Sequence, residues 1–167
     1  PNGSFTHPPQ KDRLGAVSNG WKRAGVQSSL ENNVSEANKW FRKGVEEKSD
    51  LKSIEYFTKS IQLNPQLHEA YCNRGIVKMR LEIYEDAIKD FNDAINIKPA
   101  PFYFYLRAKT RNNLLQNVES VIADISVAIR EESQNIRYYA FRASVYETDT
   151  NSYSNAIEDY NKIIQLN

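Results

Sequence analysis

The feature that most constrains the fold of this chain is a set of residues that recurs about every 34 positions. Each set combines small and apolar residues at spacings of three and four, which places its members on one face of a helix. The four copies are Ser53, Phe57, Ser60, Ile61 and Pro65; Ala87, Phe91, Ala94, Ile95 and Pro99; Val121, Ile125, Ala128, Ile129 and Ser133; and Ala156, Tyr160, Ile163 and Ile164. A period of this length predicts a stack of similar helical units, because a single unit cannot bury its apolar face alone.

A second helical stretch precedes each of these sets and carries an aromatic residue four positions before a small one. The pairs are Trp40 with Gly44, Tyr71 with Gly75, Phe104 with Ala108, and Tyr139 with Ala143. Gly75 has no side chain, so we expect the two helices of its unit to approach each other closely, with Phe91 packed at the contact. Pro99 cannot continue a helix and is expected to end the unit.

The stretch from His68 to Pro99 resembles the tetratricopeptide repeat family, whose signature places an aromatic residue, a glycine and a closing proline at these spacings. Arg74 stands at the leucine position of that signature. The resemblance implies an all-α fold, an α-solenoid of about four helical hairpins wound into a right-handed superhelix. We expect the units at about 34–65, 68–99, 101–133 and 136–167, with turns near 49–51, 82–83, 116–118 and 149–152.

Residues 1–33 differ in character from the repeats, because they hold four of the six glycines and three of the six prolines. This composition predicts an extended or disordered N-terminal arm before a repeat domain at 34–167. Ser28 and Glu31 have the spacing of a capping box, which predicts that regular helix begins near this point. Apolar residues are spaced along the arm, and we expect the part centred on Trp21 to dock on a repeat surface of the same or a neighbouring molecule.

The composition and the last residues of the sequence give expectations about the cellular location of the protein and about its continuation. No apolar run approaches the ~18 residues of a membrane-spanning helix. The single cysteine, Cys72, excludes an internal disulfide and favours a reducing compartment, so we predict a cytoplasmic protein. The sequence stops one residue short of the proline that would close its last unit. We therefore expect the natural protein to continue and this end to be adhesive, which allows self-association through an uncapped C-terminal face.

Residues of the kinds that carry catalysis are present, but not in catalytic patterns. His7 and His68 are far apart, and no glycine-rich phosphate-binding loop occurs. We predict that the chain is not an enzyme and holds neither a metal ion nor another cofactor. Acidic residues lie on polar helix faces, where we expect solvated charges; they are Glu85, Asp86, Asp90, Asp93, Glu158 and Asp159.

A binding surface is the remaining prediction. In tetratricopeptide proteins the first helices of successive units line the concave face, so the resemblance implies that a peptide or partner protein binds there. The residues expected to bind it are Cys72, Asn73, Ile76, Met79, Tyr105, Leu106, Lys109, Asn112, Phe141 and Ser144, with Phe41, Arg42 and Val45 on the same face of the first unit. This set is more apolar than a fully solvated face.

Three other functions can be weighed against a protein-binding scaffold. Co-chaperones of this family bind acidic C-terminal tails with lysine, arginine and asparagine side chains on their first three units. Of the corresponding positions in this chain, only Asn73 carries the expected residue. The positions on the first and third units carry Phe41, Val45, Phe102 and Leu106. Helical-repeat RNA binders need a basic surface, whereas residues 34–167 carry a net charge of −1. The 17 asparagines and the arm would suit a component of a cytoskeletal or ciliary assembly. We therefore predict a scaffold for proteins or extended peptides, with no nucleic acid as partner.

Overall fold

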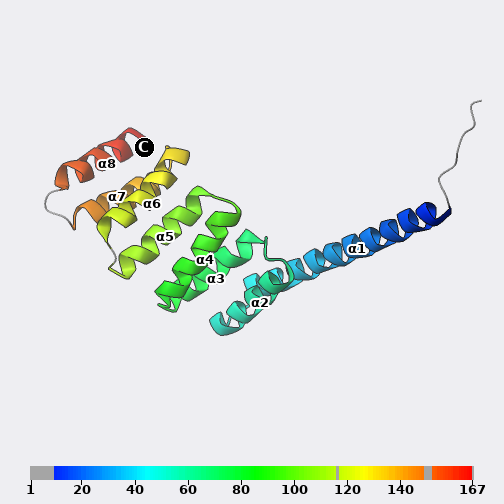
Figure 1. The fold of residues 1–167 in the computed structure, drawn as a ribbon. Coiled ribbons are helices and arrows are strands. Elements are labelled where there is room, and N and C mark those ends of the chain that lie inside the picture. The colour runs from blue at the N-terminus through cyan, green and yellow to red at the C-terminus, as the bar shows by residue number, and fades with distance from the viewer. Residues whose placement is uncertain (1–9, 116, 149–151, 167) are drawn as a thin grey trace, which may run out of the picture.

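The computed structural model describes residues 10–115, 117–148 and 152–166, and it describes side chains from residue 26 onward. In this part of the chain all regular secondary structure is helical (Figure 1). The helices are α1 (Gln10–Glu46), α2 (Asp50–Leu63), α3 (His68–Arg80), α4 (Tyr84–Ile97), α5 (Pro101–Asn113), α6 (Val118–Glu131), α7 (Ile136–Tyr146) and α8 (Tyr153–Leu166). The predicted all-α solenoid is confirmed.

The helices form four pairs that stack in chain order. Within a pair, the first helix packs on the second, as in α3 and α4, and each second helix then packs on the first helix of the next pair. The second, third and fourth predicted units each contain one pair, and the first contains α2 with the last part of α1. The observed turns at 47–49 and 81–83 lie within two residues of those predicted, and α6 begins at Val118, the last residue of the third predicted turn. The predicted turn at 149–152 falls largely on residues 149–151, which lie outside the described part of the chain.

The N-terminal segment differs from the prediction. Residues 10–33 are not extended or disordered; they form the first part of α1, which continues without a break into the first repeat. Helix α1 therefore begins at Gln10 rather than near Ser28, and it runs well beyond the helix pairs (Figure 1). Residues 26–35 are all exposed, including Val26, Leu30 and Val34 on one stripe. Residues 1–9 and the side chain of Trp21 lie outside what is described, so the docking of the arm stays a prediction.

The close approach of paired helices follows the small residues of the repeat. A Cβ atom added to Gly75 would lie 2.8 Å from Cε1 of Phe91, and one added to Gly44 would lie 2.6 Å from Cε1 of Phe57. Both distances are shorter than those of real Cβ contacts, so the neighbouring phenylalanine ring leaves no room for a side chain at either glycine. Ala108 and Ala143 take the equivalent places in the third and fourth pairs and are fully buried. The predicted contact between Gly75 and Phe91 is confirmed.

We expect Gly75→Leu to destabilise the protein by at least the ~1–3 kcal/mol typical of overpacking, because its side chain must displace the Phe91 ring. The free energy of unfolding in urea, followed by circular dichroism, measures this loss. Lys89→Leu, on the exposed face of α4, is the matched control and should cost at most ~1 kcal/mol, because it removes only an exposed ion pair. An unchanged urea midpoint for Gly75→Leu would contradict the observed helix contact.

A row of arginines, which we call the arginine ladder, connects the helix pairs. Each arginine belongs to a first helix and binds an aspartate on the second helix of its own pair through two parallel N–H···O bonds. A third N–H of each arginine donates to a polar side chain on the second helix of the preceding pair. The three rungs are Thr58–Arg74–Asp90, Asn92–Arg107–Asp124 and Ser126–Arg142–Asp159.

The ladder is compact and largely buried. In its third rung, the Arg142 Nη2–Asp159 Oδ1 distance is 2.6 Å and the Nη1–Ser126 Oγ distance is 3.0 Å. Each arginine also lies over the aromatic residue one turn before it, for example Arg107 at 5.4 Å from the Phe104 ring. One guanidinium thus joins three helices, which a lysine ammonium could not do with the same planar geometry.

The ladder corrects the prediction of solvated charges for two of the six acidic residues, Asp90 and Asp159, whereas the other four keep exposed or partly exposed side chains. Asp90 is 2% exposed and Asp159 is 3% exposed, and both are held in ion pairs. Lys78 adds a second cation to Asp90 at 2.8 Å, and Arg111 does the same for Asp124 at 2.7 Å. Among the described residues, no buried side-chain nitrogen or oxygen lacks a hydrogen-bond partner.

We expect Arg142→Met to destabilise the fold by ~3–5 kcal/mol, because it leaves the buried Asp159 carboxylate without its cation. The double variant Arg142→Met/Asp159→Leu should recover part of this loss, since the unpaired charge is then absent. Lys89→Met breaks the exposed ion pair with Asp86 and should cost at most ~1 kcal/mol. Equal losses of unfolding free energy for the buried and exposed variants would contradict the structural role of the ladder.

Candidate peptide-binding groove

The first helices of the pairs form one continuous face, and their order along the stack decides which side chains meet. Helices α3 and α5 contact each other directly, although α4 lies between them in sequence. We call the surface formed by α1, α3, α5 and α7 the first-helix face. All the residues predicted to bind a partner belong to it.

The structure divides the predicted binding residues into two groups. Cys72, Tyr105 and Leu106 are buried, with exposed fractions below 9%, because the rotation of α3 and α5 turns them into the core between pairs. The prediction that these three present their side chains to a ligand is therefore corrected. The others keep partly or fully exposed side chains; they are Asn73, Ile76, Met79, Lys109, Asn112, Phe141 and Ser144.

A pocket at the junction of the first two pairs brings two of the predicted residues together. This α1/α3 pocket has a volume of about 180 Å³. Its lining residues are Gly44, Val45, Glu47, Ser53, Phe57, Asn73, Ile76, Val77 and Arg80. Asn73 and Ile76 were predicted as binding residues, and Val45 was predicted to lie on the same face. Glu47 and Arg80 were missed, since they come from a turn and from the end of α3.

The polar groups of the α1/α3 pocket are held in place by local bonds. The amide nitrogen of Asn73 donates to the Glu69 carbonyl at 2.8 Å, so its amide oxygen is left to accept a hydrogen bond from a ligand. Arg80 binds Asp50 at the start of α2. The backbone N–H groups of Ser49 and Lys48 donate to the Glu47 carboxylate and lower its pKa. The pocket thus combines an apolar floor with one fixed amide and two opposite charges.

The predicted residues of the third and fourth pairs do not line this pocket. Met79, from α3 of the second pair, does not line it either and packs against the core cluster that contains Leu106. Lys109 lies with its Nζ atom 5.8 Å from the centre of the Tyr105 ring. The Phe141 ring meets that same tyrosine edge to face at 5.6 Å. This half of the face therefore presents the partly exposed side chains of Lys109 and Phe141, both packed on the buried Tyr105 ring.

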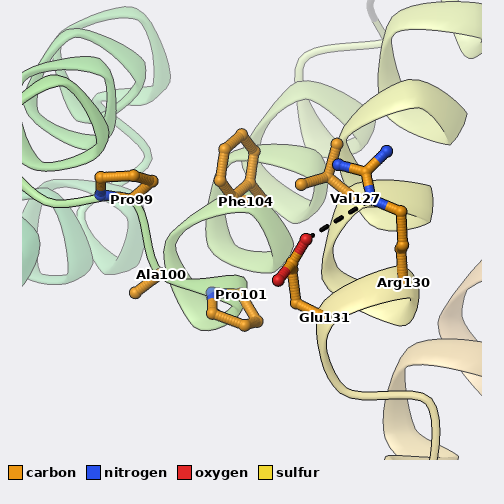
Figure 2. Close-up of a pocket in the computed structure, with 7 residues that line it drawn as sticks. All are labelled: Pro99, Ala100, Pro101, Phe104, Val127, Arg130 and Glu131. Carbon is orange, nitrogen blue, oxygen red and sulfur yellow. Dashed lines mark hydrogen bonds and ion pairs between the residues drawn. The ribbon is translucent and has the colours of Figure 1, made fainter.

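A larger pocket of about 290 Å³ lies between α5 and α6, away from the predicted residues (Figure 2). Its lining residues are Pro99, Ala100, Pro101, Phe104, Val127, Arg130 and Glu131. Arg130 and Glu131 form an exposed ion pair with each other at 3.4 Å. The only polar side chains of this pocket are therefore already paired, whereas the α1/α3 pocket offers the amide oxygen of Asn73. We take the smaller pocket as the candidate site for this reason.

Side chains suited to metal binding are not clustered in the part of the chain that the structure describes. No group of three or more His, Cys, Asp or Glu residues there could hold a metal ion. Nor do the described helices include one that is long and apolar enough to span a membrane. Burial raises the pKa of the Cys72 thiol to about 12, and the nearby Glu69 carboxylate acts in the same direction.

Cys72 should consequently react slowly with a thiol reagent in the native protein. With a pKa of about 12, the thiolate fraction at pH 8 is on the order of one in ten thousand, and it becomes large only as the pH rises through that value. We expect reaction with 5,5′-dithiobis(2-nitrobenzoate) to become fast once urea unfolds the chain. The matched control is Cys72→Ala/Ser144→Cys, which moves the thiol to an exposed position of α7 and should react at once. Equal native rates for the two proteins would contradict the burial of Cys72.

Comparison with known proteins identifies similar chains. A family model described as tetratricopeptide repeat matches residues 68–101 and 136–167. The human mitochondrial import receptor subunit TOM70 is 28% identical over 130 residues, covering 73% of this chain and 21% of the relative. An uncharacterized protein of Methanocaldococcus jannaschii is 37% identical over 65 residues, covering 37% of this chain and 76% of the relative. The chain thus spans about a fifth of the length of the TOM70 relatives.

A solved structure agrees over nearly the whole chain. The crystal structure of MamA has a TM-score of 0.74 at 17% identity, covering 98% of this chain and 96% of that one. At this level of identity the match concerns the fold alone. The two family-model matches coincide with the second and fourth helix pairs, α3 with α4 and α7 with α8.

Proposed function

Because this chain belongs to the tetratricopeptide repeat family, we propose that it is a non-catalytic scaffold that binds a partner protein as an extended peptide along the first-helix face. The observation that carries the proposal is the α1/α3 pocket, where the fixed amide of Asn73 stands beside an apolar floor. Extended peptides bind such surfaces by combining backbone hydrogen bonds with pockets for individual side chains.

The dimensions of the pocket favour a single side chain as its occupant. Pockets for small molecules and cofactors typically measure about 300–1,000 Å³, which is larger than the 180 Å³ observed. Ile76, Val45 and the Phe57 ring would surround an apolar side chain of the ligand. The Asn73 amide oxygen would accept a backbone N–H of the same ligand, which aligns the peptide without reading its sequence.

An acidic tail of the kind bound by co-chaperones is not the ligand that this surface favours. Phe41 and Val45 occupy the first-unit slots, and the Phe41 ring packs on Phe57 with 5.8 Å between ring centres. In the third unit, Leu106 is buried. Carboxylates of a tail would therefore find apolar groups where they need cations. An apolar residue of the partner is the better anchor.

The wider setting of the protein remains a prediction. A relative named as an import receptor subunit supports a role in contacting other proteins. Cytoplasmic location, with a cytoskeletal or ciliary assembly as one setting, is still expected from composition alone.

Selection of peptides from a phage-displayed random library tests the function. We expect the selected peptides to share one bulky apolar residue. Ile76→Asp should weaken their binding by tenfold or more, because it places a charge in the pocket. Asn73→Ala should weaken it by about three- to tenfold, the range of one neutral hydrogen bond.

Leu51→Asp is the control for the peptide experiment, since Leu51 is an exposed leucine of α2 outside the pocket lining. It should leave the affinity unchanged, as measured by fluorescence anisotropy. Peptides that bind Ile76→Asp as well as the native protein, or that lose affinity only with Phe104→Ala in the α5/α6 pocket, would refute the proposed site.

A further inference from the structure

Aromatic and cationic side chains meet on the first-helix face at the junction of the third and fourth helix pairs. This α5/α7 patch consists of Phe102, Tyr105 and Lys109 of α5 and Arg137 and Phe141 of α7. The ring centre of Phe102 lies 6.3 Å from that of Tyr105, and the ring centre of Phe141 lies 5.6 Å from it. The Nζ atom of Lys109 is 5.8 Å from the centre of the same tyrosine ring. The patch thus lies between two pairs that pack on each other and is separate from the α1/α3 pocket.

Tyr105 lies at the centre of the patch and is held in position by its neighbours. It is 8% exposed, and its ring packs on the Tyr138 ring at 5.1 Å as well as on Phe141. Its hydroxyl has no hydrogen-bond partner among the described residues, although no fully buried side-chain oxygen or nitrogen in that part of the chain lacks one. The hydroxyl oxygen is therefore accessible, and its O–H can donate a hydrogen bond to a ligand.

The two cations of the patch are not neutralised by a carboxylate. Burial raises the pKa of Tyr105, and the Arg137 guanidinium acts in the opposite direction, so Arg137 is close enough to affect the hydroxyl. Among the described residues, neither Arg137 nor Lys109 forms an ion pair, whereas the arginines of the ladder are all paired with aspartates. A free hydroxyl between two unpaired cations is a set of donors that suits a carboxylate.

The phenylalanines of the patch add an apolar requirement. Phe102 is 41% exposed, and Phe141 is partly exposed. In an extended peptide, residues two positions apart point to the same side. A peptide that places a carboxylate beside Tyr105 can therefore cover these two rings with an apolar residue two positions away.

Charge disfavours the N-terminal part of this chain as the occupant. Residues 1–26 contain Lys11, Arg13, Lys22 and Arg23 but only Asp12 as an acidic residue, so their net charge is +3. Docking them on the α5/α7 patch would bring like charges together, which weakens association. A segment of opposite charge from a partner protein is the complementary ligand.

We propose that the α5/α7 patch binds an acidic residue of the extended peptide that the α1/α3 pocket anchors by an apolar side chain. Tyr105 and Arg137 donate hydrogen bonds to the carboxylate of that residue, and Lys109 adds a second positive charge. The inference rests on the proposed function and extends it from one anchor to two, with an acidic and apolar partner segment as the ligand class.

The geometry of the stack gives the separation of the two anchors along the peptide. Packed helices lie ~10 Å apart, and two such steps separate the α1/α3 pocket from the α5/α7 patch, which gives ~20 Å. An extended chain covers ~3.3 Å per residue. The acidic residue should therefore lie about six positions from the apolar residue in the pocket.

Parallel selections from one phage-displayed random peptide library test this inference. One selection uses the native protein and the other uses the double variant Lys109→Gln/Arg137→Gln. We expect peptides selected by the native protein to carry a bulky apolar residue with Asp or Glu about six positions away. The double variant should select the same apolar residue without the acidic one. Arg137→Glu should favour Lys or Arg at that position instead.

The selections separate failure of the inference from failure of the proposed function. Peptides that share the apolar residue but show no acidic preference would overturn the inference and leave the proposed function intact. The same acidic preference in the double variant would also overturn it. Peptides without a common apolar residue would refute the α1/α3 site and, with it, the second anchor.

Affinities of one selected, fluorescein-labelled peptide, measured by fluorescence anisotropy, test the contact directly. Replacing its acidic residue by the corresponding amide should weaken binding by about five- to tenfold, as should Arg137→Gln. Both changes together should cost little more than either alone, because they remove the same contact. Arg137→Lys should keep most of the affinity. The loss caused by Arg137→Gln should shrink between about 0.05 and 0.5 M NaCl.

The control for net charge is Lys59→Gln/Lys98→Gln, which removes two exposed lysines, one from α2 and one at the C-terminal end of α4. It should bind the peptide like the native protein, and an equal loss of affinity would overturn the inference. Sedimentation equilibrium provides the test for a second copy as the occupant. A dimer of the native protein that is abolished by Arg137→Glu would assign the patch to self-association and contradict the proposal.

Discussion

A planar guanidinium that reaches three helices at once is the element on which the stacking of this protein depends. In each rung, one arginine neutralises a buried aspartate of its own pair and donates to a polar side chain of the pair before. The first contact orients the two helices of a pair, and the second sets the register between neighbouring pairs. Small residues such as Gly75 let the two helices of a pair approach closely. The hydrogen bonds of the arginine ladder then fix how the helices are oriented relative to one another.

Local packing was predictable from the sequence because it repeats at helical spacing. Gly75, Phe91 and the residues around them predict a close helix pair, and this pair is present. The ladder was not predictable in the same way. Arg74 occupies a position where the family signature has leucine, and its aspartate lies 16 residues away across a turn. A carboxylate on an otherwise polar helix face gives no sign that a cation from another helix will cover it.

Helix α1 and the groove show two other limits of sequence reasoning. Glycines in residues 10–33 argued against helix, but each costs a helix only about 1 kcal/mol relative to alanine, which does not forbid one. Among the residues predicted to bind a partner, Asn73 and Ile76 line the α1/α3 pocket, whereas Cys72 and Leu106 are buried. Neighbouring residues on a helix point about 100° apart, so a small rotation of α3 or α5 exchanges a surface residue for a core one.

The first helix pair lacks an internal rung of the ladder, since Lys43 stands in place of the arginine and Tyr56 in place of the aspartate. Aromatic stacking of Trp40 on Tyr56, with 5.6 Å between ring centres, is found there instead. Stacked repeats open from an end, one neighbour at a time, so this pair should fray before the others. The α1/α3 pocket exists only while the first helix pair is packed on α3. A ligand bound in the pocket would therefore stabilise the packing of the first pair on the second. Slower amide hydrogen exchange in α1 and α2 would then accompany binding.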